Sequence, residues 1–339
     1  MTITRKKEKL IRKWILRSLL IIFILIISGT AYFFFSPVPT AWIVNKAFEG
    51  GMSVAPDNYI ELLQQTSTIE NVDYHSRYPD GELDIIYPKQ TTNQTPVIFW
   101  IHGGAYVGGD KSDITQYAVQ LAANGYAVVN INYALAPKGQ YPAPLVQVSE
   151  AYTYMKNNAD KYGLSLDRIY IAGDSAGAQL AGQFVNIQSD SDYASQVGIA
   201  PVVDRETIKG TLLFCGPYEL SKLASIEGND TLKFLMRRIG WAYIGTKDWE
   251  NQPETQLASI IDHVSGRYPP TFITDGNVGS FEEHGKDLAV ALTNHGVPVK
   301  SIFYDKSAGE LGHEYQFLMN TPAAQQTFKA VIQFLNAYR

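Results

Sequence analysis

The sequence has a single cysteine, Cys215, among 339 residues, so no disulfide can form within the chain. Its apolar neighbours at 212–214 are typical of an inert core thiol. The chain lacks a surplus of positive charge, because 28 Lys and Arg residues face 33 Asp and Glu residues. Nucleic acid is therefore not an expected partner. No heptads or fixed-period repeats appear, which excludes coiled-coil and solenoid architectures.

Charge is absent from one long segment near the N-terminus. Residues 1–17 hold seven cations and one anion, whereas residues 19–35 hold no charged residue. With residues 14–18 added and Arg17 extended toward the interface, the stretch reaches the roughly 20 residues of a bilayer span. We predict a single-pass signal anchor in the cell membrane, with an extracytoplasmic domain. A cleaved secretory signal is the alternative, since residues 28–31 are small.

From residue 84 onward, stretches typical of strands alternate with stretches typical of helices. The expected strands are 84–87, 96–101, 127–133, 168–172, 211–214, 271–275 and 299–304. The expected helices are 112–124, 144–158, one that begins near 176, and 323–338. Parallel strands need helical crossovers, and these cover both faces of a sheet. The pattern therefore predicts an α/β fold with a mostly parallel, twisted sheet.

Two segments fall outside this alternation. Residues 37–80 contain prolines and glycines among mixed apolar residues, and we predict a linker and a partly helical cap there. Residues 218–268 separate two expected strands and are rich in large apolar side chains, which favours a lid-like insertion. Both segments could instead complete the core. The predicted organisation is a cytoplasmic basic tail and transmembrane signal anchor at 1–36, a linker and cap segment at 37–80, and an α/β domain at 81–339 that includes the lid-like insertion at about 218–268.

One junction between an expected strand and an expected helix reads Gly-Asp-Ser-Ala-Gly, at residues 173–177. The two glycines permit a tight turn that lifts the Ser175 hydroxyl out of the sheet. The N–H of Ala176, at the start of the helix, can stabilise negative charge on a bound carbonyl oxygen. Ser175 is therefore a candidate nucleophile.

A second glycine-rich loop, His102-Gly103-Gly104-Ala105, follows the expected strand 96–101. Gly103 and Gly104 can turn their N–H groups toward the same carbonyl oxygen and complete an oxyanion hole. His102 is expected to be a buried residue that shapes this loop. A serine hydroxyl needs a positioned imidazole to accept its proton. His313, between the last expected strand and the final helix, is the candidate base.

The order of these motifs resembles the hormone-sensitive-lipase-like branch of the α/β-hydrolases, the α/β-hydrolase fold-3 esterases. The resemblance covers about residues 80–339 and is carried by residues 102–105, 133–137, 141–143, 173–177 and 312–313. It implies an α/β-hydrolase fold and hydrolysis of carboxylic esters with no metal or organic cofactor. It also implies Ser175 as nucleophile and His313 as base, with an oxyanion hole made by the N–H groups of Gly103, Gly104 and Ala176.

The carboxylate of the family's catalytic triad is missing from its usual place, where Gly279 aligns with the family's aspartate. Asp275, at the end of the expected strand 271–275, is the first candidate to replace it. Glu282 or Glu283 at the next helix start, Glu219, and a dyad without a carboxylate remain open. Ser280 and Glu283 also have the spacing of a helix capping box.

The predicted function is a membrane-anchored, outward-facing serine carboxylesterase that forms an acyl-enzyme intermediate. Its expected partners are a small ester substrate and, through the N-terminal helix, the lipid bilayer. Two alternatives stay open. One is a cell-envelope deacetylase or exopeptidase of the same fold, and the other is a non-catalytic α/β-hydrolase-like binding protein.

Overall fold

The computed structural model describes residues 2–92, 94–226 and 230–339. Within them, an eight-stranded sheet has the order β1-β2-β4-β3-β5-β6-β7-β8. The strands are β1 (Thr66–Asp73), β2 (Glu82–Pro88), β3 (Val97–Ile101), β4 (Ala127–Ile131), β5 (Ile169–Asp174), β6 (Ile208–Phe214), β7 (Thr271–Asp275) and β8 (Val299–Phe303). The β1–β2 and β2–β4 pairs are antiparallel, and the other pairs are parallel. The expected α/β architecture is confirmed.

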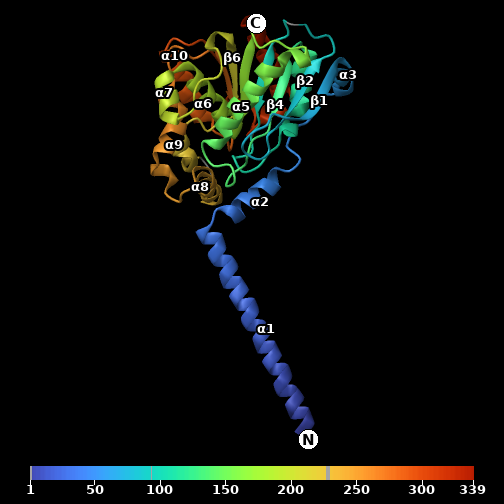
Figure 1. Cartoon of the computed structure of the whole chain (residues 1–339), viewed down its shortest axis with the longest axis vertical. Helices are drawn as coiled ribbons and strands as arrows, with labels where there is room; N and C mark the ends of the chain where they lie inside the picture. Colours follow the sequence, from blue (N-terminus) through green and yellow to red (C-terminus); the bar gives the residue numbers. More distant parts are fainter. Residues whose placement is uncertain (1, 93, 227–229) are drawn as a thin grey trace.

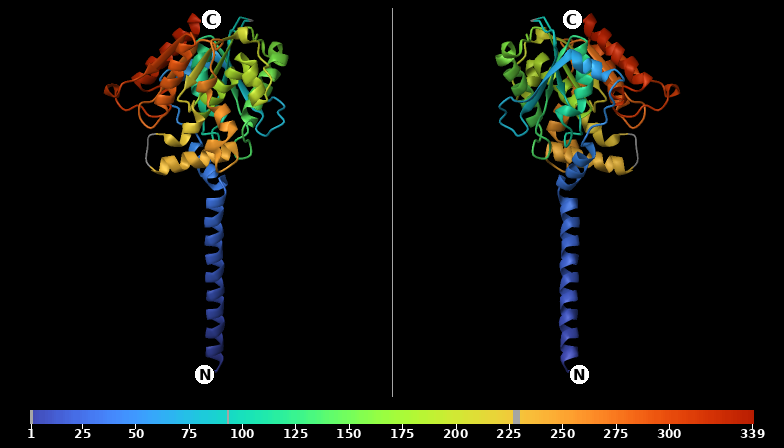
Figure 2. Two further views of the ribbon diagram at one scale, coloured as in Figure 1. Left: turned by 90° about the vertical axis from the view of Figure 1, so that its left-hand side faces the viewer. Right: turned by 90° about the vertical axis from the view of Figure 1, so that its right-hand side faces the viewer.

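Helices cover both faces of the sheet, as the two side views in Figure 2 show. The helices packed on the sheet are α4 (Thr115–Ala123), α5 (Ala143–Asn158), α6 (Ala176–Ser189), α10 (Glu282–Asn294) and α11 (Pro322–Ala337). β3 contributes Val97, Phe99 and Ile101 to the core cluster beneath α5 and α6. Its Ile98 and Trp100 join the cluster beneath α4 and α11. Successive side chains of a strand point to opposite faces, so a strand covered on both sides is apolar throughout.

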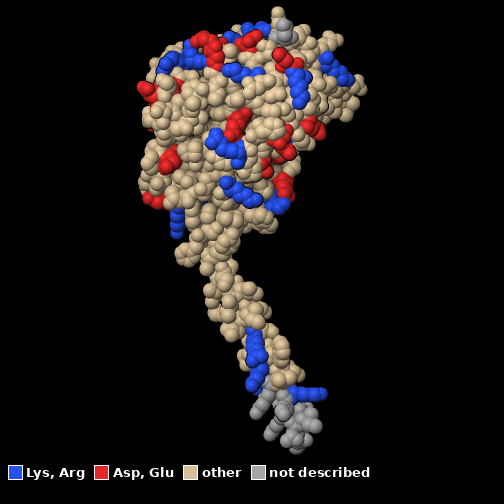
Figure 3. Space-filling model, viewed as in Figure 1, with Lys and Arg blue, Asp and Glu red and all other residues tan. Residues whose placement is uncertain are grey.

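The N-terminal helix α1 (Thr2–Phe35) projects away from the rest of the chain (Figure 1). Its segment Leu10–Phe35 is a candidate membrane span with a hydropathy of 2.4, and the most apolar 18-residue window within it is not buried against the rest of the protein. In Figure 3 the part of this helix nearest the body carries no Lys, Arg, Asp or Glu. Length and composition suit a membrane span, although a signal sequence meets the same criteria.

The segment 37–80 holds α2 (Val38–Phe48) and α3 (Tyr59–Gln65), and it also holds β1, which the sequence did not predict. β1 pairs antiparallel with β2 at the edge of the sheet. The sheet therefore begins inside the segment expected to be linker and cap. An edge strand with one solvated face lacks the continuous apolar run that marks the inner strands.

The segment 218–268 is mostly helical between β6 and β7, with α8 (Asp230–Ile244) as its longest helix. α8 packs against α2, and both lie between α1 and the sheet (Figure 1). The remaining helical segments are α7 (Ser191–Val197), α9 (Pro253–Ala258), η1 (Lys111–Ile114), η2 (Ala159–Tyr162), η3 (Arg205–Thr207), η4 (Leu220–Ser225), η5 (Trp249–Asn251), η6 (Ile260–His263), η7 (Lys306–Ala308) and η8 (Tyr315–Phe317).

Candidate active site

Ser175 lies on a sharp turn between β5 and α6. Its backbone has φ 50° and ψ −123°, a conformation that is strained for a residue with a side chain. The flanking glycines have no room for a side chain. A Cβ on Gly173 would lie 2.3 Å from the carbonyl oxygen of Gly177, and one on Gly177 would lie 2.0 Å from that of Ile101. These contacts explain why both glycines are needed to present the Ser175 hydroxyl at the sheet edge.

His313 reaches Ser175 from the loop after β8. Its Nε2 lies 2.9 Å from Ser175 Oγ, and its Nδ1 lies 2.7 Å from Ser280 Oγ. Burial lowers the pKa of His313 to about 4, because a cation is poorly solvated there. The imidazole is therefore neutral near pH 7. The structure thus brings the predicted nucleophile and the predicted base into hydrogen-bonding contact.

Asp275 ends β7 and is connected to His313 through Ser280. Its Oδ1 accepts hydrogen bonds from the Ser280 hydroxyl and from the Gly276 N–H, the latter at 2.7 Å. The side chain is 1% exposed, and burial raises the pKa of Asp275 to about 7. Asp275 is thus joined to His313 Nδ1 through one hydroxyl, whereas Glu314 Oε1 lies 3.7 Å from Nε2, the ring nitrogen that faces Ser175. This position of Ser280 was not predicted from the sequence.

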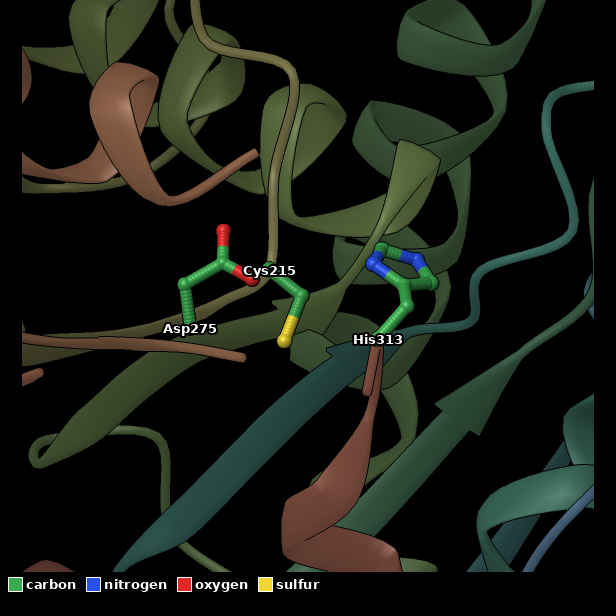
Figure 4. A group of neighbouring side chains, drawn as sticks. All are labelled: Cys215, Asp275 and His313. Atoms are coloured by element: carbon green, nitrogen blue, oxygen red, sulfur yellow. The ribbon is translucent and has the colours of Figure 1, made fainter. Parts of the chain in front are cut away.

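Cys215 lies beside these groups, as Figure 4 shows. Ligand atoms of Cys215, Asp275 and His313 all lie within 4.8 Å of one another, so the three could in principle surround a metal ion. Burial raises the pKa of the Cys215 thiol, however, and the thiolate is the form that binds metals. The imidazole and the carboxylate already hydrogen-bond to Ser280. The donor set therefore fits a hydrogen-bonded relay better than a metal centre.

The other carboxylates considered from the sequence point elsewhere. Glu282 and Glu283 lie 3.2 and 2.9 Å from the ammonium of Lys286, and Glu219 lies 2.8 Å from that of Lys222. Among the described residues, none of the three hydrogen-bonds to His313. The predicted capping box is not formed either, because Phe281 is the N-cap of α10 and no side chain caps it.

The predicted oxyanion loop needs one correction, at Gly103. Its N–H donates to Asp174 Oδ2 at 2.8 Å and is therefore not available to a substrate oxygen. A Cβ on Gly103 would lie 2.4 Å from that same oxygen and 3.0 Å from Ser175 Cβ. Glycine is thus required at position 103 by close packing, not as an oxyanion donor. The spacing of glycines in the motif cannot distinguish these two roles.

The next two residues turn sharply, with φ 112° at Gly104 and 54° at Ala105. In the part of the chain that the structure describes, the N–H groups of Gly104, Ala105 and Ala176 have no hydrogen-bond partner within the protein. Backbone N–H groups this close to a buried site usually have a partner. These three N–H groups are candidate donors for a substrate carbonyl oxygen.

A buried pair of carboxyl groups, Asp174 and Glu314, supports this loop and was not predicted from the sequence. Asp174 accepts from Trp100 Nε1 at 2.7 Å and is hydrogen-bonded to Glu314. Burial raises the pKa of Asp174 to about 6 and that of Glu314 above its usual range. Such a pair shares a proton, because two buried like charges repel each other.

His102 and Cys215 occupy the positions expected of them. His102 is 2% exposed, stacks on the ring of Tyr133 at 4.5 Å and places Nδ1 2.6 Å from the Gly103 carbonyl oxygen. Burial lowers its pKa to about 4. Cys215 is fully buried.

A parallel sheet with a strained serine at the end of β5, and a histidine from the loop after the last strand, defines the chain as an α/β-hydrolase. The BD-FAE family is matched over residues 83–281, more than half of the chain, and the chain belongs to that family. The resemblance to the α/β-hydrolase fold-3 esterases, predicted from the motifs, is confirmed.

Several characterised proteins are similar to this chain. The versiconal hemiacetal acetate esterase of Dothistroma septosporum is 28% identical over 285 residues, which cover 78% of this chain and 85% of that protein. Esterase LipC of Mycobacterium tuberculosis is 28% identical over 189 residues, 55% of this chain and 45% of LipC. The crystal structure of esterase B from Lactobacillus Rhamnosis (HN001) has a TM-score of 0.73 at 22% identity, covering 87% of this chain and 90% of its own. That likeness shows the shared fold.

Proposed function

We propose that this protein is a membrane-anchored serine carboxylesterase whose active site lies outside the cytoplasm. The observation that carries the proposal is the 2.9 Å contact between His313 Nε2 and Ser175 Oγ at a strained strand-to-helix turn. The esterases among the relatives support carboxylic esters as the substrate class. The long apolar helix α1 and its basic N-terminal flank support the anchor and its orientation.

In the proposed reaction, Ser175 Oγ attacks the ester carbonyl carbon while His313 Nε2 accepts the hydroxyl proton. The N–H groups of Gly104, Ala105 and Ala176 stabilise the oxyanion, so Ala105 replaces Gly103 among the predicted donors. His313 then returns the proton to the leaving alcohol. Water hydrolyses the acyl-enzyme in a second step with the same base.

Asp275 acts on His313 through Ser280 and sets the position of the ring proton. When Asp275 is ionised, the Ser280 hydroxyl donates to it, and Ser280 Oγ accepts the Nδ1–H of His313. Nε2 is then unprotonated and can accept the proton of Ser175. When Asp275 is protonated, it donates to Ser280, which donates in turn to Nδ1. The ring proton then resides on Nε2, and the base is lost.

The Asp174–Glu314 pair has a supporting role beside the oxyanion donors. Asp174 holds the Gly103 N–H, and so it fixes the start of the loop that carries Gly104 and Ala105. A second full negative charge here would destabilise the developing oxyanion, because like charges repel each other strongly in a buried site of low dielectric constant. The shared proton limits the charge of this pair.

Steady-state hydrolysis of p-nitrophenyl acetate tests the proposed activity. Ser175→Ala should lower kcat at least a thousandfold, as expected when a nucleophile is removed. Ser195→Ala, at an exposed serine of α7, is the matched control and should leave kcat unchanged. Activity retained in Ser175→Ala would reject Ser175 as the nucleophile.

Alkaline carbonate washing of membranes tests the proposed anchor. Release of the full-length chain from the membranes would reject it.

A further inference from the structure

Arg238 of α8 holds the C-terminal end of α1. Its guanidinium donates to the backbone carbonyls of Phe33 and Ser36, and to that of Phe34 at 3.5 Å. The last carbonyls of a helix have no partner within the helix, and the helix dipole favours a cation there. Arg238 is 6% exposed. This contact fixes α8 to the end of the apolar helix.

Aromatic rings enclose the same guanidinium. Its central carbon lies 5.3 Å from the ring centroid of Phe33, 5.9 Å from Phe234 and 4.8 Å from Trp241. Phe33 and Phe234 also stack on each other at 6.2 Å. Cation–π contacts at these distances are attractive and grow stronger when water is excluded. The junction between α1 and α8 is therefore packed, not a flexible hinge.

The length of α1 places this junction at the surface of a bilayer. Twenty helical residues from Trp14 span about 30 Å, the thickness of the hydrocarbon core, and they end at Phe33. The last turn is aromatic from position 32 to position 35, and its Tyr32 is of a residue type enriched at membrane interfaces. With α1 across the bilayer as proposed, the Arg238 contact to that turn would place α8 at the level of the outer lipid headgroups.

The first turns of α2 continue this surface with exposed apolar side chains, whereas Lys46 and Glu49 form an exposed ion pair near the C-terminal end of the helix. Val38, Trp42 and Ile43 are exposed at 39%, 62% and 51%, on the side of the helix opposite the buried Thr40, Ala41 and Val44. Phe35 and Phe234 are also exposed. In Figure 3 the surface is tan where the helix joins the body, and charged side chains lie beside it on the lower edge of the body. This apolar surface is continuous with the membrane-spanning segment, which identifies its partner as the bilayer.

The other side of α2 rests on the loop that supplies the proposed oxyanion donors. Asn45 Nδ2 donates to the Val107 carbonyl at 3.0 Å. A Cβ on Gly108 would lie 3.0 Å from Asn45 Cα and 3.4 Å from Phe48 Cβ. α2 is about 16 Å long at 1.5 Å per residue, so a single short helix joins the bilayer surface to the active-site loop.

We propose that α2 and the segment of α8 around Phe234 and Arg238 lie in the outer headgroup layer and that the enzyme takes its substrates from the membrane, as acyl esters dissolved in the outer leaflet. This inference rests on the proposed function, an anchored esterase. The Arg238 contact holds the active-site edge toward the lipid. An ester with a long acyl chain can then reach Ser175 without its chain first crossing bulk water.

The test uses the full-length protein in phosphatidylcholine vesicles with two substrates, water-soluble p-nitrophenyl acetate and bilayer-dissolved 4-methylumbelliferyl palmitate. Arg238→Gln should lower palmitate hydrolysis at least fivefold and leave acetate hydrolysis within twofold. Arg237→Gln changes an exposed arginine on the same helix and should alter neither rate. Equal loss on both substrates, or loss on neither, would overturn the inference. Absence of acetate hydrolysis in the unaltered protein would instead reject the proposed function.

Depth measurements give a second readout that does not depend on catalysis. Trp42→Cys, labelled with bimane, should be quenched by nitroxide-bearing lipids. Ile60→Cys is the matched control, because Ile60 is 67% exposed on α3, at the far end of the body (Figure 1). Cys215 is fully buried and should not react under native conditions. Quenching at both positions, or at neither, would contradict the proposed orientation.

Discussion

Replacing Ser280 with alanine removes the hydroxyl that lies between Asp275 and His313. Asp275 keeps its bond to the Gly276 N–H at 2.7 Å, whereas His313 Nδ1 loses the partner that stands 2.7 Å away. The contact between His313 Nε2 and Ser175 is not touched directly. The variant therefore isolates the orientation of the imidazole and its tautomer from the proton transfer itself.

The size of the effect follows from the bond that is lost. A hydrogen bond to a charged group contributes about 1.5–3 kcal/mol. A barrier change of about 1.4 kcal/mol alters the rate tenfold. Ser280→Ala should therefore lower kcat roughly 10- to 150-fold, with little change in KM, because Ser280 hydrogen-bonds the base rather than the substrate.

The pH dependence of kcat/KM gives a sharper readout than a single rate. Burial raises the pKa of Asp275 to about 7 and lowers that of His313 to about 4. In the proposed mechanism ionised Asp275 is the active form, so activity should rise with pH through about 7. In Ser280→Ala this rise in activity should disappear or move to lower pH. Without the hydroxyl, ionisation of Asp275 no longer changes the hydrogen bond at His313 Nδ1.

Glu283→Gln is the matched control for the charge near the start of α10, since Glu283 contacts the surface Lys286. It should have near-normal kcat and an unchanged pH profile. If Ser280→Ala stays within threefold of the unaltered enzyme while Asp275→Asn loses more than a hundredfold, Asp275 acts without the bridge and the relay is wrong. If both variants stay within tenfold, no carboxylate orients the base.

Three further predictions concern the same site. Ser175→Ala and His313→Ala should each lower kcat by a similar factor, and the double variant should lose little more, because the pair acts as a unit. Gly103→Ala should lower both thermal stability and kcat, since its Cβ would lie 2.4 Å from Asp174 Oδ2; overpacking of this kind costs roughly 1–3 kcal/mol in urea unfolding. Folded Asp275 binds its proton more tightly than the unfolded chain does, so the free energy of unfolding should fall as pH rises from the usual carboxyl pKa to about 7. Asp275→Asn should flatten that slope.

The inner strands could be predicted because burial on both faces leaves long apolar runs such as Val97–Ile101. β1 was missed because Thr66–Asp73 forms an edge with mostly half-exposed and exposed residues and many polar ones. The arrangement of Ser175 and His313 could be anticipated because a tight turn needs glycines at fixed positions. The order of strands then determines which loop faces the serine.

The remaining parts of the site depend on local loop paths that motif spacing does not specify. Ser280 has the spacing of a helix cap, yet the loop after β7 directs its hydroxyl to Asp275 and His313 instead. Gly103 matches the pattern of an oxyanion donor, but Asp174 takes its N–H. Each of these outcomes depends on a partner from another strand end.

The most direct test of the central claim is to map the serine that becomes covalently modified. The enzyme is treated with a p-nitrophenyl phosphonate and digested, and the peptides are analysed by mass spectrometry. We predict one adduct per chain on Ser175, formed much more slowly in His313→Ala and absent in Ser175→Ala. An adduct on another residue, or equal labelling rates with and without His313, would contradict it.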